Sequence, residues 1–76
     1  MNKVVLPALG EGITKATIAC WHVQEGDKVK TGEDVVELVT DKAAFNVSTP
    51  HAGTVKKILV KEGQEAPVGE TLAIIE

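Results

Sequence analysis

The sequence repeats itself at an offset of 37 residues. Glu25-Gly26 aligns with Glu62-Gly63, and Gly32-Glu33 aligns with Gly69-Glu70. Apolar residues align at the same offset in five further pairs: Ile18 with Val55, Trp21 with Ile58, Val23 with Val60, Val35 with Leu72 and Leu38 with Ile75. Because the turn glycines and the apolar positions repeat together, the chain is predicted to contain two equivalent halves, approximately residues 15–39 and 52–76. We expect an approximate two-fold axis to relate them.

The pieces between turns are too short for ordinary helices. Glycine (7 residues) and proline (3) interrupt the chain often, and 11 Val, 5 Ile and 7 Thr favour pleated, half-buried surfaces. We expect a single all-β domain over residues 1–76, a flattened barrel or sandwich of two four-stranded antiparallel sheets. Its eight strands are predicted at residues 3–6, 15–23, 28–30, 35–39, 44–48, 54–60, 65–67 and 71–75.

The alternation of apolar and polar residues slips at the same place in both halves. Apolar positions run from Ile18 to Trp21 in one half and from Val55 to Ile58 in the other. A shared slip of this kind predicts a β-bulge at residues 19–20 and again at residues 56–57.

Composition excludes several classes of function. A net charge of -3 and only two aromatic residues argue against nucleic-acid binding. No apolar run approaches the roughly 20 residues of a membrane span. Cys20 is the only cysteine, so no disulfide forms and we expect it to have no redox role; His22 and His51 lie far apart, so no metal site is predicted. An unpaired thiol favours a reducing compartment.

The most exposed reactive group is predicted at the centre of the chain. Two β-branched runs flank Thr40-Asp41-Lys42-Ala43, which indicates a hairpin with its turn at these residues. Lys42 would stand at the tip of that turn, beside the small Ala43. The two-fold relation makes the C-terminus the counterpart of this turn, so we expect both termini at the opposite end of the molecule. Most exposed lysines are simply solvated charges.

An enzyme active site is not expected in this chain. The sequence contains no Ser/His/Asp set, and a thin sandwich is predicted to have no room for a pocket of about several hundred cubic ångströms. A carrier of an attached reactive group needs only an accessible nucleophile on a rigid tip.

The first half contains about six residues that the second half lacks. Pro7 and Glu25 are 18 positions apart, whereas Pro50 and Glu62 are 12 apart. The extra residues lie within 8–14. From the residues alone, this loop is either a contact surface or a tolerated insertion.

Motifs along the whole chain resemble those of one known family. They are Leu6-Pro7, Gly10-Glu11-Gly12-Ile13, Trp21-His22-Val23, Glu25-Gly26-Asp27, Thr40-Asp41-Lys42-Ala43, Gly53-Thr54-Val55 and Val68-Gly69. In this order the chain resembles a lipoyl domain of the dihydrolipoyl acyltransferase of 2-oxo acid dehydrogenase complexes, within the biotinyl/lipoyl attachment family. The resemblance implies the hammerhead form of the sandwich and lipoate joined to Lys42 through an amide.

The resemblance also implies a swinging-arm carrier that is not catalytic on its own. Its lipoyl-lysine would be reductively acylated by a thiamine-diphosphate 2-oxo acid decarboxylase. The acyl group would pass to coenzyme A at the acyltransferase core, and dihydrolipoyl dehydrogenase would reoxidise the carrier. The isolated domain would be monomeric and would lie in the cytoplasm, or else in the mitochondrial matrix.

Two recognition surfaces follow from the same resemblance. Asp41 and Ala43 would define the turn that a lipoate ligase or lipoyl transferase recognises. The decarboxylase would recognise the loop from residue 9 to residue 14, which consists of Leu9, Gly10, Glu11, Gly12, Ile13 and Thr14.

Alternative functions remain open from the sequence. A biotin carrier domain shares this fold, but its lysine is flanked by methionines, and the sole methionine here is Met1. An unmodified lipoyl-like interaction module is the third alternative. Within the lipoyl family, the Gly-Glu-Gly-Ile segment weakly favours pyruvate or branched-chain complexes by resemblance. It does not decide which 2-oxo acid is served. The end of the sequence at the last strand suggests a domain excised from a longer protein.

Overall fold

The computed structural model describes residues 2–76, and these residues form eight strands and no helix. All eight predicted strands are present. Three have the predicted bounds, and the other five differ by one or two residues at one or both ends. The strands are β1 (Asn2–Val5), β2 (Lys15–Trp21), β3 (Lys28–Val29), β4 (Asp34–Val39), β5 (Ala44–Ser48), β6 (Gly53–Ile58), β7 (Glu65–Pro67) and β8 (Thr71–Ile75).

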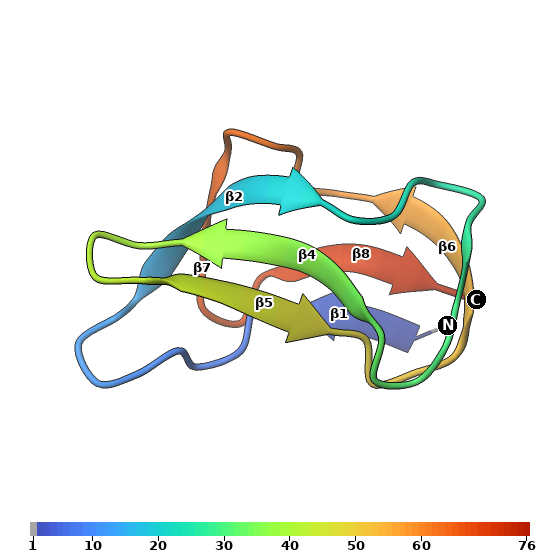
Figure 1. The fold of residues 1–76 in the computed structure, drawn as a ribbon, viewed down its shortest axis with the longest axis horizontal. Coiled ribbons are helices and arrows are strands. Elements are labelled where there is room, and N and C mark those ends of the chain that lie inside the picture. The colour runs from blue at the N-terminus through green and yellow to red at the C-terminus, as the bar shows by residue number, and fades with distance from the viewer. Residues whose placement is uncertain (1) are drawn as a thin grey trace.

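The strands form two four-stranded antiparallel sheets, as predicted (Figure 1). One sheet has the order β1-β8-β6-β3, and the other has the order β5-β4-β2-β7. Under a shift of 37 residues, β2, β3 and β4 correspond to β6, β7 and β8. The order β4-β2-β7 in one sheet therefore corresponds to the order β8-β6-β3 in the other. The short strands β3 and β7 each lie in the sheet formed mainly by the other half. The two halves are therefore interlocked through their backbone ladders.

The predicted irregularity is present in both halves. The register shifts between Ile18 and Cys20 where β2 pairs with β4, and between Val55 and Lys57 where β6 pairs with β8. Just after each bulge, a backbone N–H donates to a side-chain carboxylate from the opposite half. The Glu62 carboxylate accepts the Trp21 N–H at 3.0 Å, and the Glu25 carboxylate accepts the Ile58 N–H at 2.9 Å. The two bonds are equivalent under the 37-residue shift.

The core is a thin layer of aliphatic side chains between the sheets. Trp21 packs against its edge, half-buried, and its Nε1–H donates to the carbonyl of Val60 at 2.9 Å. The largest fully buried apolar residues are Leu6, Ile18, Leu38, Leu72, Ile75, Val4, Val35, Val36 and Val55. These residues come from both sheets, so neither sheet has a buried face without the other.

The chain ends lie opposite the central turn, as the two-fold relation predicts. Asn2 pairs with Ile75 across β1 and β8, and Glu76 exchanges two backbone hydrogen bonds of 2.8 Å with Thr54. Figure 1 shows both ends of the chain at one extreme of the longest dimension, 32 Å, and the β4–β5 turn at the other extreme. No helix in the described part of the chain has the length and apolar character needed to cross a membrane.

Among the glycines of residues 2–76, Gly53 should be the least tolerant of a side chain. A Cβ at position 53 would lie 2.6 Å from the Glu76 carbonyl oxygen, at a φ of +153°. Gly53→Ala should therefore lower the free energy of unfolding by more than about 1 kcal/mol. Gly26→Ala is the matched control, because its φ is +94° but no heavy atom lies within 4 Å of the added Cβ. Urea unfolding should give the lower midpoint for Gly53→Ala; equal midpoints would contradict the steric argument.

Candidate modification site and adjoining groove

The side chain of Thr40 holds the turn between β4 and β5. Val39 pairs with Ala44, and the Thr40 N–H donates to the Ala43 carbonyl at 2.9 Å. Asp41 and Lys42 occupy the tip with negative φ, although two-residue hairpin turns favour types that need positive φ. Thr40 Oγ1 accepts the N–H groups of Lys42 at 3.1 Å and Ala43 at 3.2 Å, and it donates to the Ala43 carbonyl at 3.2 Å. These bonds stabilise a turn whose backbone geometry is otherwise disfavoured.

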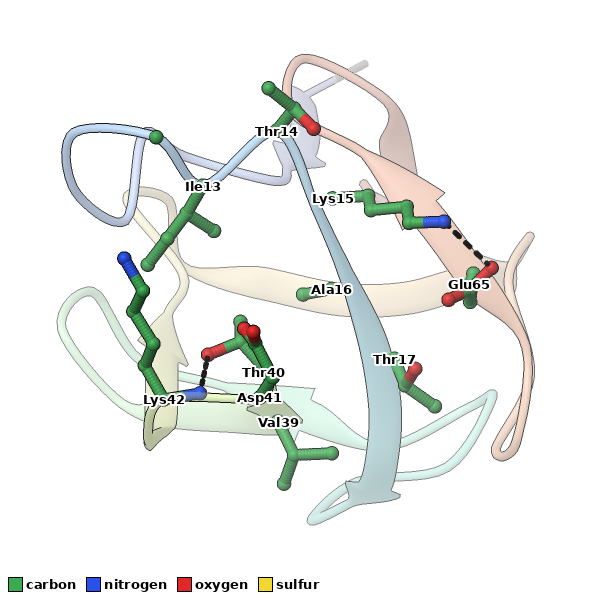
Figure 2. Close-up of a pocket in the computed structure, with 11 residues that line it drawn as sticks. Ile13, Thr14, Lys15, Ala16, Thr17, Val39, Thr40, Asp41, Lys42 and Glu65 are labelled. Atoms are coloured by element: carbon green, nitrogen blue, oxygen red, sulfur yellow. Dashed lines mark hydrogen bonds and ion pairs between the residues drawn. The ribbon is translucent and has the colours of Figure 1, made fainter.

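Lys42 is exposed at the tip of this ordered turn. Its backbone N–H is held by Thr40, whereas its ammonium group has no hydrogen-bond or ion-pair partner among residues 2–76. Figure 2 shows the side chain leaving the turn in the direction of the loop that carries Ile13. The structure therefore combines a constrained backbone with an accessible amine, as the attachment of a group to Lys42 would require.

A groove lies directly beside the turn, contrary to the expectation that so thin a sandwich has no pocket. It has a volume of about 550 Å³ and is open to solvent. Its walls are residues 12–17 on one side, residues 39–42 on another, and Glu65 (Figure 2). The expectation was wrong because the groove is not a cavity in the core. It lies on the surface, where β2, the extra loop of the first half and the turn between β4 and β5 meet.

The structure brings together only part of the predicted recognition loop. Gly12, Ile13 and Thr14 line the groove together with Asp41 and Lys42. Glycine and glutamate at positions 10 and 11 are exposed outside it, and Ala43 is exposed in the turn. Leucine at position 9 is half-buried and packs against the hydrophobic core, so its role in the fold is that of an anchor for the loop.

Sequence reasoning missed several residues at this site. Lys15 and Glu65 form an ion pair of 3.6 Å along the groove, with both side chains more than half exposed. Their strands, β2 and β7, pair across some fifty residues of sequence, which no local pattern reveals. Thr40 was also missed as a positioning residue, although a threonine in the first position of a turn is a recognisable signal.

Cys20 lies in a different part of the sheet, at the bulge of β2. Its partial burial, followed by the negative charges of Glu37 and Glu62, raises the pKa of the thiol. The raised pKa favours the neutral thiol, which is the less reactive form.

Comparison with known proteins identifies the family. The family described as "biotin-requiring enzyme", which unites biotinyl and lipoyl domains, matches residues 2–75. The chain therefore belongs to this biotin/lipoyl family.

Two relatives within this family are acyltransferase components of 2-oxo acid dehydrogenase complexes. The succinyltransferase component of the 2-oxoglutarate dehydrogenase complex of Rickettsia bellii is 44% identical over 73 residues, which are 96% of this chain and 18% of that protein. The acetyltransferase component of the pyruvate dehydrogenase complex of Zymomonas mobilis is 45% identical over 74 residues, or 96% of this chain and 17% of that protein. The chain thus spans less than a fifth of these curated relatives.

A solved structure of a single domain is also similar to this chain. The lipoyl domain of the 2-oxoglutarate dehydrogenase complex from Azotobacter vinelandii superposes with a TM-score of 0.73 at 31% identity, covering 96% of this chain and 95% of that one. The predicted resemblance to a lipoyl domain of an acyltransferase component is confirmed. The relatives come from 2-oxoglutarate as well as pyruvate complexes, so they do not support the lean towards pyruvate or branched-chain substrates.

Removing the Thr40 hydroxyl should loosen the turn. Thr40→Val keeps the shape of the side chain but loses every hydrogen bond of Oγ1, so we expect a loss of about 1 kcal/mol in unfolding free energy. The amide protons of Lys42 and Ala43 should exchange faster with solvent, as followed by NMR. Thr40→Ser keeps the hydroxyl and should behave like the parent chain. Unchanged exchange in Thr40→Val would show that the backbone alone holds the turn.

Proposed function

We propose that residues 1–76 form one carrier domain that holds lipoate on Lys42 and presents it to the enzymes of a 2-oxo acid dehydrogenase complex. The observation that carries the proposal is the position of Lys42. Its amine is exposed and unpaired on a turn held by Thr40, at the end of the molecule opposite both termini. A tether to the rest of a longer protein would therefore leave the modified end unobstructed.

The residues around Lys42 fit a lipoyl group better than a biotinyl group. Asp41 and Ala43 flank the lysine where biotin carriers have methionines. Ala43 adds little bulk at the turn, and the open groove beside Lys42 leaves room for an attached arm. The related structure at 31% identity is a lipoyl domain. Biotin attachment remains the second candidate, because the family includes biotin-requiring enzymes.

In this proposal the chain's own residues supply attachment and positioning. When bound, lipoate supplies a dithiolane that takes up and releases acyl groups and electrons. The hairpin keeps the Lys42 backbone fixed while its long side chain extends into solvent. Tethering at the opposite end raises the effective concentration of the carried group at each enzyme of the complex. The domain itself performs no catalysis.

The partners follow from the two surfaces at this end of the molecule. A lipoate ligase or lipoyl transferase would recognise Asp41 and Ala43 on either side of the target lysine. A thiamine-diphosphate 2-oxo acid decarboxylase would recognise the groove and the exposed part of the 9–14 loop. The acyltransferase core and dihydrolipoyl dehydrogenase would then act on the carried group. Such a complex would place the domain, as a monomeric module, in the cytoplasm or the mitochondrial matrix.

Lys42 should be the sole site of lipoylation. Incubation of the chain with a lipoate ligase, lipoate and ATP should add the mass of one lipoyl group and change the net charge from -3 to -4, because the amide removes the lysine charge. Lys42→Arg should remain unmodified. Lys28→Arg, an exposed lysine on β3, is the matched control and should be modified like the parent chain. Modification of Lys42→Arg, or a mass gain with biotin ligase and biotin instead, would overturn the assignment.

The groove should affect recognition by the decarboxylase without affecting lipoylation. Ile13→Ser removes an apolar side chain from the groove wall and leaves the Leu9 anchor intact. We expect the rate of reductive acylation by the cognate decarboxylase to fall about fivefold or more, corresponding to the roughly 1 kcal/mol of a contributing interface residue. Leu59→Ser, a change of an apolar side chain that is 41% exposed elsewhere, is the control. Equal acylation of Ile13→Ser and Leu59→Ser would contradict a role for the groove.

A further inference from the structure

Three potential metal ligands meet on the surface of the sheet that contains β2, β4 and β5. Cys20 on β2 is the direct cross-strand partner of Glu37 on β4, and Glu37 in turn pairs with Asn46 on β5. His22 follows two residues after Cys20. Ligand atoms of Cys20, His22 and Glu37 all lie within 4.8 Å of one another, and the Cys20 Sγ is 4.0 Å from a Glu37 carboxylate oxygen.

We propose that Cys20, His22 and Glu37 form a binding site for Zn²⁺, with the fourth coordination position open to water. Thiolate, imidazole and carboxylate are the ligand types that zinc accepts in proteins, and three such ligands leave one tetrahedral position for water. The expectation of no metal site failed to anticipate this cluster because it considered only the cysteine and the two histidines. The third donor, Glu37, lies 17 residues from Cys20 and reaches it only through the β2–β4 ladder.

Asn46 supports this assignment by orienting the imidazole. Its side-chain oxygen lies 3.1 Å from His22 Nε2. With the amide oxygen as acceptor, the tautomer that makes this hydrogen bond carries its proton on Nε2 and leaves the Nδ1 lone pair available to a metal. Histidines that bind zinc commonly donate their other N–H to a fixed oxygen acceptor in this way. Asn46 would therefore act as a positioning residue and not as a ligand.

The two-fold relation shows that the fold does not require this cluster. The positions equivalent to the three donors, 37 residues later, lie on or next to β6 and β8. The sequence has Lys57, Leu59 and Ile74 there. None of these residues binds a metal, yet the bulge and the strand pairing are the same there. The donors of the first half are thus an addition to a shared framework.

Charge and rigidity also favour a cation at this position. Glu62 lies near enough to Cys20 to act on it electrostatically, so a second carboxylate stands near the one that Glu37 contributes to the cluster. Two of the donors, Cys20 and Glu37, stand on paired strands, which limits the backbone movement needed to bring the ligands to bonding distance. Binding forms the S–Zn bond as the thiol releases its proton to solvent, with no change of oxidation state.

The proposal is tested by zinc titration of the untagged 76-residue chain, with Lys42→Arg present so that no dithiol is attached. Isothermal titration calorimetry should show one Zn²⁺ per chain, and NMR should place the largest shifts at Cys20, His22 and Glu37. Replacing Zn²⁺ by Co²⁺ should give a thiolate-to-cobalt absorption band. Asn46→Ala should lower the affinity by about 10–100-fold, as loss of an outer partner does, and Cys20→Ser should lower it further.

Variants of potential zinc ligands elsewhere in the chain serve as matched controls. His51→Gln and Glu70→Gln remove an exposed imidazole and an exposed carboxylate elsewhere and should leave the affinity unchanged. The NMR shifts of the chain that carries Lys42→Arg alone locate the metal even if a further variant is destabilised. Absence of zinc binding, equal binding by Cys20→Ser, or shifts centred on His51 would each overturn the proposal. None of these outcomes bears on lipoylation of Lys42, because the site lies outside the turn and the groove.

Discussion

The exchange of short strands between the two halves is the constraint on which the rest of the structure depends. β3 pairs with β6 and β7 pairs with β2, so each sheet is completed by three or fewer residues of the other half. A chain of 76 residues buries a smaller share of its surface than a larger domain does, so its core is thin. The two halves are also connected by the backbone ladders that they share. Glu25 and Glu62 add to this connection, because each accepts a backbone N–H from the other half. A rigid frame of this kind can hold an exposed hairpin in a defined position.

The function of the molecule lies in the places where the two halves differ. The frame alone would present equivalent ends. One end, however, carries the turn of Thr40 to Ala43 and the additional loop, whereas the other carries both termini. The additional loop supplies one wall of the groove beside the hairpin. The donor cluster of Cys20, His22 and Glu37 is a second departure from symmetry, on the surface of an otherwise shared sheet. The attachment and recognition proposed for Lys42 would therefore occupy positions that the shared framework does not need.

Most of the architecture could be predicted because its signals are local and occur twice. Period-2 alternation located the strands, turn glycines located their ends, and the repeated slip located both bulges. Predictions about the recognition loop were less complete. Leu9 was assigned to a contact surface, but the structure packs it against the core, since a loop of this length needs an apolar anchor. The groove was not anticipated at all, because part of its wall depends on the pairing of β2 with β7, which brings Glu65 to Lys15.

By itself, the sequence determined the fold class, the two-fold relation of the halves and Lys42 as the candidate attachment residue. Each of these depends on residue type and spacing within one strand or turn, or on comparison of one half with the other. Only the tertiary structure decided which distant side chains meet: Ile13 with the Lys42 turn, and Cys20 with Glu37. The physical reason is that side chains from different strands become neighbours through ladder register, and register is set by the packing of the whole sheet rather than by any single segment.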